Sequence, residues 1–106
     1  MDRAVYRVIK DYRKILEGMG VRVKRIILYG SHTLGLSRED SDIDLVVISD
    51  DFGKMDLWER LTLLGQAAAI LKKPIEALGY TEGEFVSKGE GSFIVDEVKS
   101  KGVEVK

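Results

Sequence analysis

The sequence feature that most constrains the fold is an apolar run at residues 43–48 that two carboxylates introduce. The run is rich in β-branched side chains and is predicted to form a strand. Asp42 and Asp44 flank Ile43, and because side chains alternate along a strand, the two carboxylates point the same way. Two carboxylates side by side are explained by a divalent cation between them. The alternative is a pair of ordinary strand-edge or capping acids on a solvated loop.

A second predicted strand, over residues 21–29, ends in a Gly-Ser pair. Val23 alternates with charged neighbours, and a continuous apolar stretch follows before Gly30 and Ser31. A Gly-Ser turn offers backbone N–H groups and a hydroxyl to a phosphate. Ten residues separate Ser31 from Asp42. Together the turn and the carboxylates indicate a site for a metal and a triphosphate, and hence nucleotide chemistry.

The rest of the chain alternates between helical and strand patterns. Asp2 is the expected N-cap of the first helix, over residues 5–19. Pro74 is expected to end the helix over residues 56–72. The other predicted elements are a helix over residues 5–19, a short helix over 31–36, a helix over 56–72, a strand over 75–80, a helix over 82–88, a last helix that Ser92 caps, and a strand over 103–105. This order predicts an α/β (α+β) fold, in which helices pack on a small mixed β-sheet of three to four strands.

Two capping boxes are expected, Asp56 with Glu59 and Thr81 with Glu84. The helix over residues 56–72 is expected to bury an apolar stripe along its length, made of Leu57, Leu61, Leu64, Ala68 and Leu71. Trp58 is assigned to the core or to a subunit contact rather than to base stacking.

A third acid stands alone in the strand predicted over residues 75–80. If this strand lies beside the strand that Asp42 precedes, Glu76 can reach the same metal site. Its role would be to hold a second metal ion and to activate an incoming hydroxyl. The alternative is a glutamate on the solvent face of an edge strand. His32 and Arg38 are interpreted as solvated loop side chains.

Composition limits the class of protein. A chain of 106 residues is expected to form one domain, residues 1–106, and its 17 basic and 18 acidic side chains give a net charge of −1. This balance does not predict direct nucleic-acid binding. No cysteine, no apolar stretch of membrane-spanning length and no secretory leader are present, so the expected location is the cytoplasm. The absence of asparagine is typical of a thermophilic source.

The spacing of the Gly30-Ser31 pair, the Asp42/Asp44 pair and the third acid resembles the DNA polymerase β-type nucleotidyltransferase superfamily. The short chain is similar to its minimal nucleotidyltransferase (MNT) group, whose members are commonly paired with HEPN-domain proteins in toxin–antitoxin modules. The resemblance covers nearly the whole chain. It implies that Asp42, Asp44 and Glu76 bind Mg²⁺ and that Gly30 and Ser31 hold a nucleoside triphosphate. The implied reaction moves AMP from ATP to a hydroxyl of a HEPN-type partner protein, with this chain as the antitoxin.

One departure keeps other functions open. Many members continue after the Gly-Ser pair with an arginine-rich turn, whereas here residues 32–35 read His-Thr-Leu-Gly. The first alternative is a non-catalytic module that neutralises a HEPN partner by contact and keeps a weakened nucleotide site. Another is transfer to a small molecule such as an aminoglycoside. The expected assembly is a homodimer or a hetero-oligomer.

Overall fold

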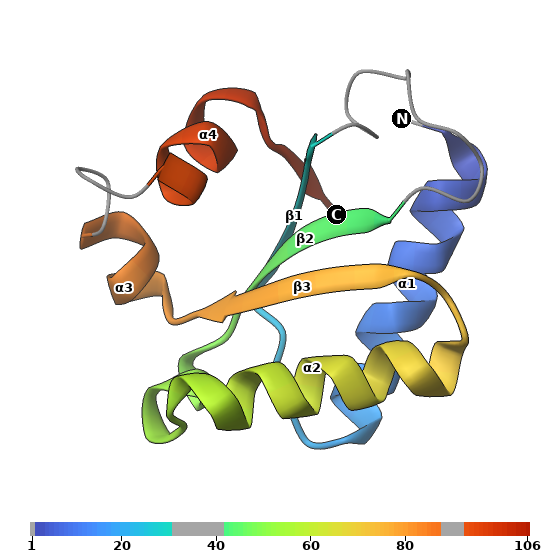
Figure 1. The fold of residues 1–106 in the computed structure, drawn as a ribbon, viewed down its shortest axis with the longest axis horizontal. Coiled ribbons are helices and arrows are strands. Elements are labelled where there is room, and N and C mark those ends of the chain that lie inside the picture. Colours follow the sequence, from blue (N-terminus) through green and yellow to red (C-terminus); the bar gives the residue numbers. More distant parts are fainter. Residues whose placement is uncertain (1, 31–41, 88–92) are drawn as a thin grey trace.

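A mixed β-sheet forms the centre of the molecule and positions the carboxylates (Figure 1). The computed structural model describes residues 2–30, 42–87 and 93–106. Along the chain the elements are α1 (Arg3–Gly18), β1 (Arg25–Tyr29), β2 (Ile43–Ile48), the 3-10 helix η2 (Asp50–Lys54), α2 (Leu57–Leu71), β3 (Ile75–Tyr80), α3 (Glu82–Ser87), α4 (Phe93–Lys101) and β4 (Val103–Val105).

The strands of this sheet lie in the order β3-β2-β1-β4. β1 pairs antiparallel with both β2 and β4, whereas β2 and β3 are parallel. Parallel neighbours need a crossover, and α2 provides it between β2 and β3. The predicted class, a small mixed sheet of three to four strands with helices packed on it, is therefore confirmed.

Helices cover both faces of the sheet (Figure 1). On one face, α1 and α2 pack against the side chains of Ile26, Leu28 and Leu45. On the other, Phe85 of α3 and Val95 of α4 pack with residues of β1 and β2. Because β2 is covered on both sides, four successive residues from Leu45 to Ile48 are fully buried. None of the helices in the described part of the chain combines the length and apolar character that a membrane crossing requires.

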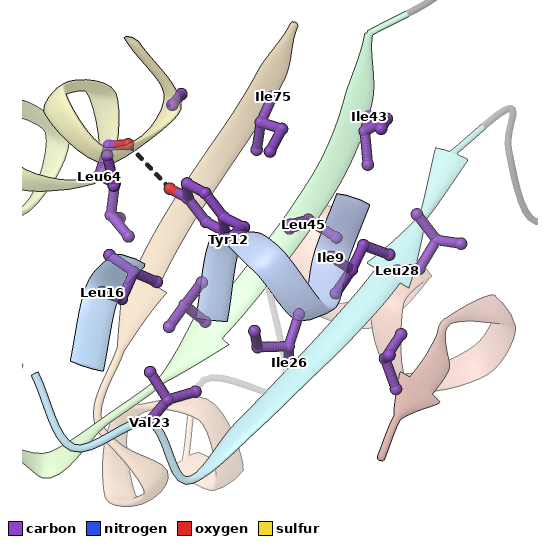
Figure 2. Close-up of a cluster of buried hydrophobic side chains, with 14 of the residues drawn as sticks. Ile9, Tyr12, Leu16, Val23, Ile26, Leu28, Ile43, Leu45, Leu64 and Ile75 are labelled. Carbon is purple, nitrogen blue, oxygen red and sulfur yellow. Dashed lines mark hydrogen bonds between the residues drawn. The ribbon is translucent and has the colours of Figure 1, made fainter. Parts of the chain in front are cut away.

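The larger core joins α1 to the sheet and to α2 (Figure 2). Ile9, Tyr12 and Leu16 come from successive turns of α1 and are fully buried. The Tyr12 hydroxyl donates a 2.8 Å hydrogen bond to the Leu64 carbonyl of α2, which satisfies its only polar group inside the core. Burial raises the pKa of Tyr12, so this hydroxyl keeps its proton at physiological pH.

Local signals placed most helix ends correctly. The Asp2 side chain accepts from the N–H of Ala4 at the start of α1. Both expected capping boxes form: Asp56 with Glu59 at α2, and Thr81 with Glu84 at α3. α2 ends at Leu71, before Pro74, with Lys72 in the left-handed conformation. The predicted helix over 31–36 and its cap lie outside the described residues, as does the Ser92 cap.

Two predictions were wrong, one about where a strand begins and one about which side chains are buried. The strand predicted over residues 21–29 begins only at Arg25, because Arg25 pairs with Ile48, the last residue of β2. Leu57 was expected in the core but is 62% exposed. Trp58 was expected in the core or at a subunit contact, and its exposure of 75% contradicts the first of these alternatives. Both residues belong to the first turn of α2, whose buried residues, Leu64, Ala67 and Ala68, lie further along the helix.

Substitution of Gly79 by alanine is expected to lower the free energy of unfolding by about 1–3 kcal/mol. A Cβ at this buried position of β3 would lie 2.8 Å from the Phe52 ring, and Phe52 is fully buried. Equilibrium unfolding in urea measures the loss. Gly53→Ala is the control, because its Cβ would meet only Thr81 at an ordinary 3.5 Å. Equal stability of the two variants would contradict the prediction.

Candidate functional site

Two adjacent strands bring three carboxylates to one end of the sheet. Asp42 directly precedes β2, and Asp44 is the second residue of that strand. In the parallel register of β2 and β3, Asp44 lies opposite Glu76. The expectation that the strand carrying Glu76 lies beside the strand that Asp42 precedes is therefore met. Asp42 and Glu76 are exposed to solvent, and Asp44 is half-buried.

All three carboxylates lie on the face of the sheet that α3 and α4 cover. Val46 and Ile48 alternate with Leu45 along β2 and pack in the smaller core beneath these two helices. By the same alternation, Asp44 lies on this face, and Glu76 follows from its register. The two helices cover the opposite end of this face (Figure 1), so the end that carries the carboxylates stays accessible.

The charges of Asp42 and Asp44 act on Glu76. The charge of Asp42 raises the pKa of Glu76, a hydrogen bond between the two carboxyl groups adds to this effect, and the charge of Asp44 contributes further. Such crowding disfavours the ionised form of Glu76 unless a positive charge joins the group. A divalent cation is the ligand that relieves this repulsion, because carboxylate oxygens are its preferred donors.

No three His, Cys, Asp or Glu side chains of the described ranges form a ready-made set of metal ligands. The Glu76 carboxyl is hydrogen-bonded to Asp42. The strand register places Asp44 beside Glu76, and the charges of Asp42 and Asp44 act on Glu76. Carboxylate side chains of this kind fit a divalent metal.

Gly30 follows β1 and lies against Asp44. Its φ of 78° is in the left-handed region, and a Cβ there would stand 2.5 Å from the Asp44 Oδ2 atom. Only glycine leaves room for the carboxylate and adopts this backbone without strain. The Gly of the predicted phosphate-binding turn is therefore next to the acidic pair. Ser31, the second residue of that turn, lies outside the described residues, as do His32 and Arg38.

Replacing Gly30 by alanine is expected to destabilise the protein by about 2–3 kcal/mol, of which backbone strain supplies about 1 kcal/mol. Gly20→Ala separates the two effects. Gly20 also has a positive φ, 93°, but a Cβ there meets nothing within 4 Å. Thermal or urea unfolding of both variants measures the difference. If Gly20→Ala loses as much stability as Gly30→Ala, the contact with Asp44 contributes nothing.

Tyr29 is a site neighbour that the sequence analysis did not single out. It pairs with Asp44 across β1 and β2 and is half-buried. Burial raises the pKa of Tyr29 to about 12, and the charges of Asp44 and Glu76 act in the same direction. The phenol is thus a neutral hydrogen-bonding group. Alternation along β1 places Tyr29 on the same face as Ile27, but only the register of β1 against β2 places it beside Asp44.

A cavity of about 450 Å³ adjoins the carboxylates at the outer edge of β3. Tyr29 and Glu76 line it, together with Ala77 and Leu78 of β3 and a wall from α2 that includes Leu61 and Gly65. Its volume lies in the range of sites that bind small molecules or side chains. No sequence pattern indicated this cavity, because its two walls come from elements that only the fold brings together.

Comparisons with known proteins agree with this geometry. Residues 9–105 match the family model described as a nucleotidyltransferase domain. No curated protein sequence matches significantly. Among solved structures, a toxin–antitoxin complex with AMP-PNP aligns with 92% of this chain and 71% of its own, at 21% identity and a TM-score of 0.64. A mutant of the toxin–antitoxin MntA–HpeT aligns with 92% and 71%, at 19% identity and a TM-score of 0.62.

A further similar structure contains a tri-AMPylated HEPN toxin of Shewanella oneidensis in complex with an MNT antitoxin. It aligns with 93% of this chain and 71% of its own, at 18% identity and a TM-score of 0.54. At these identities the solved structures show that the fold is shared.

Proposed function

The chain belongs to the nucleotidyltransferase domain family, and we propose that it transfers AMP from ATP to a hydroxyl of a HEPN-type partner protein. The observation that carries the proposal is the placement of Asp42, Asp44 and Glu76 at one end of two adjacent strands, with Gly30 packed against Asp44. The choice of AMP and of a HEPN-type partner draws on the similar structures, which include AMP-PNP and an AMPylated HEPN toxin.

In the proposed reaction the acceptor oxygen forms a bond to the α-phosphorus of ATP. The bond between that phosphorus and the bridging oxygen breaks, and pyrophosphate leaves with the electron pair. Glu76 is exposed on an edge strand, where a protein acceptor can approach it, and takes up the hydroxyl proton. Gly30 leaves room beside Asp44, and we expect Gly30 and Ser31 to offer backbone N–H groups to the phosphates.

Asp42, Asp44 and Glu76 would hold Mg²⁺, whose charge offsets that of the triphosphate and of the departing pyrophosphate. The chain's own contribution is then to fix the acidic side chains on rigid strands. Asp44 is held between Tyr29 on β1 and Glu76 on β3, so its position is set by the pairing on both sides. Such positioning is the main task of a protein that catalyses phosphoryl or nucleotidyl transfer.

The test is incubation with ATP labelled in the adenine or α-phosphate, Mg²⁺ and the protein encoded by the neighbouring gene. Label is expected on the partner, and EDTA is expected to abolish it. When ATP is labelled in the γ-phosphate instead, the partner should gain no label, since only AMP is transferred. A partner that stays unlabelled, or that takes up γ-label, contradicts the proposal.

A contact-only module gives a different result in the same experiment. It would bind the partner with the same affinity in the presence and absence of ATP and Mg²⁺, and the partner would gain no mass. Calorimetry of the complex and mass spectrometry of the partner therefore separate the two functions.

A further inference from the structure

The outer edge of β3 presents backbone groups that the sheet does not use. Within the described residues β3 is the terminal strand of the sheet. The N–H of Ile43 donates to the Pro74 carbonyl at 2.8 Å, and the N–H of Ser49 donates to the Tyr80 carbonyl at 3.0 Å. In a parallel pair the residues that bond the neighbouring strand alternate. Even-numbered residues from 74 to 80 therefore face β2, and the backbone groups of the residues between them face outward.

The two ends of this edge are already engaged. The N–H of Ile75 donates to the Lys73 carbonyl at 2.9 Å. At the other end, Arg60 Nη1 donates to the Gly79 carbonyl at 3.2 Å, and an ion pair with Glu84 holds this guanidinium in place. Between them lies Ala77, whose outward N–H and carbonyl meet no hydrogen-bonding partner among the described residues. The open stretch is thus short and starts next to Glu76.

The cavity of about 450 Å³ lies directly along this open stretch. Its α2 wall belongs to a segment, residues 61–71, that has no charged side chain. Among the lining residues that the structure describes, Glu76 is the one with a charged side chain. The described lining has no cationic side chain and includes a carboxylate, so it does not suit a triphosphate. It suits an uncharged apolar or aromatic side chain. In Figure 1, α2 runs alongside β3 and flanks this edge.

We propose that the open edge of β3 and its cavity bind an extended segment of the acceptor protein, which adds to the sheet as a short strand. The inference rests on the proposed function and names the surface that delivers the acceptor hydroxyl. Ala77 supplies the backbone hydrogen bonds, and a large apolar or aromatic side chain of the acceptor fills the cavity. An extended chain fits because its backbone groups repeat every two residues, as those of the edge do. The segment is thereby brought beside Glu76.

Gly65 offers a direct test, because it lines the cavity and a Cβ there meets nothing within 4 Å. Gly65→Arg fills the cavity, and arginine is preferred to glycine in a helix, so the fold is retained. The dissociation constant for the HEPN-type protein of the neighbouring gene, and the KM for it as acceptor, are expected to rise at least tenfold. The affinity for AMP-PNP should change less than twofold. Gly18→Arg is the matched control, at a helical glycine with equally open surroundings on α1.

Hydrogen–deuterium exchange tests the backbone part. The Ala77 amide is expected to exchange at least tenfold more slowly in the complex than in the free protein. Ala77→Pro removes this N–H, which does not belong to the β2–β3 ladder, and should weaken acceptor binding as Gly65→Arg does. Unchanged exchange at Ala77, or unchanged acceptor affinity in Gly65→Arg, overturns the inference.

The outcomes separate this inference from the proposed function. If the partner binds the wild type but gains no AMP, the proposed function fails, while the effect of Gly65→Arg on partner affinity still decides the docking surface. If Gly65→Arg weakens AMP-PNP binding as much as partner binding, the cavity belongs to the nucleotide and the inference is wrong. A partner that does not bind the wild type refutes both.

Discussion

Asp44→Asn is expected to reduce AMP transfer to the partner by about a thousandfold or more, while the folded structure is retained. Asparagine keeps the shape of aspartate but removes its charge, so it would hold the proposed divalent cation much more weakly. Asp44 is the carboxylate that three features converge on: it lies opposite Tyr29, opposite Glu76, and against Gly30. A substitution at Asp44 therefore changes the residue that contacts Gly30 and pairs with both Tyr29 and Glu76.

The thermal stability of Asp44→Asn should be equal to or higher than that of the wild type. In the cation-free protein the charge of Asp44 opposes the ionisation of Glu76, and its removal relieves that repulsion. Initial rates of label transfer and a thermal melt without added metal measure the two effects. Asp50→Asn is the matched control, because Asp50 follows the other end of β2 and its exposed carboxylate forms an ion pair with Lys24 at 4.0 Å. Activity of Asp44→Asn above a tenth of the wild-type rate would refute the role of this residue.

Leu16→Ala is expected to lower the free energy of unfolding by about 3–5 kcal/mol, the largest effect on stability among the changes considered. Leu16 is fully buried and lies one turn after Tyr12 on the face of α1 that packs against the sheet and α2 (Figure 2). The substitution removes apolar contacts and leaves a cavity that rigid strands cannot close. For a domain of this size, such a loss is a large part of the total stability.

Equilibrium unfolding in urea measures this loss, and the residual fold should still bind nucleotide in the absence of denaturant. Lys14→Ala is the control, since Lys14 is exposed on the same helix and alanine keeps the helix propensity. Its stability should change by less than about 0.5 kcal/mol. A Leu16→Ala protein as stable as Lys14→Ala would mean that α1 contributes little to the core.

Local patterns predicted the elements well wherever the controlling interactions are local. The Asp2 cap and the two capping boxes form because each involves residues only two or three positions apart. β2 and β3 have the predicted bounds, since the apolar runs that define them are bounded by turn residues and by Pro74. The errors arose where burial depends on distant elements. Leu57 has the spacing of a core residue but is exposed at the start of α2.

For the candidate site, the sequence indicated Gly30, Asp42 and Asp44 because their meaning follows from short spacing: two carboxylates two residues apart on a strand, and a glycine at a strand end. The relation of Glu76 to this pair was conditional on strand order, which spacing does not define. Tyr29 and the cavity beside α2 were missed for the same reason.

By itself, then, the sequence determined which segments become helices and strands and that two acids share one side of β2, because these outcomes depend on backbone periodicity and neighbouring residues. Only the tertiary structure decided that β3 lies parallel to β2 with Glu76 opposite Asp44, and that an open edge and a cavity flank them. The physical reason is that strand pairing and cavity walls are set by how α2 crosses over and packs on the sheet. That choice is made by contacts between residues far apart in the chain.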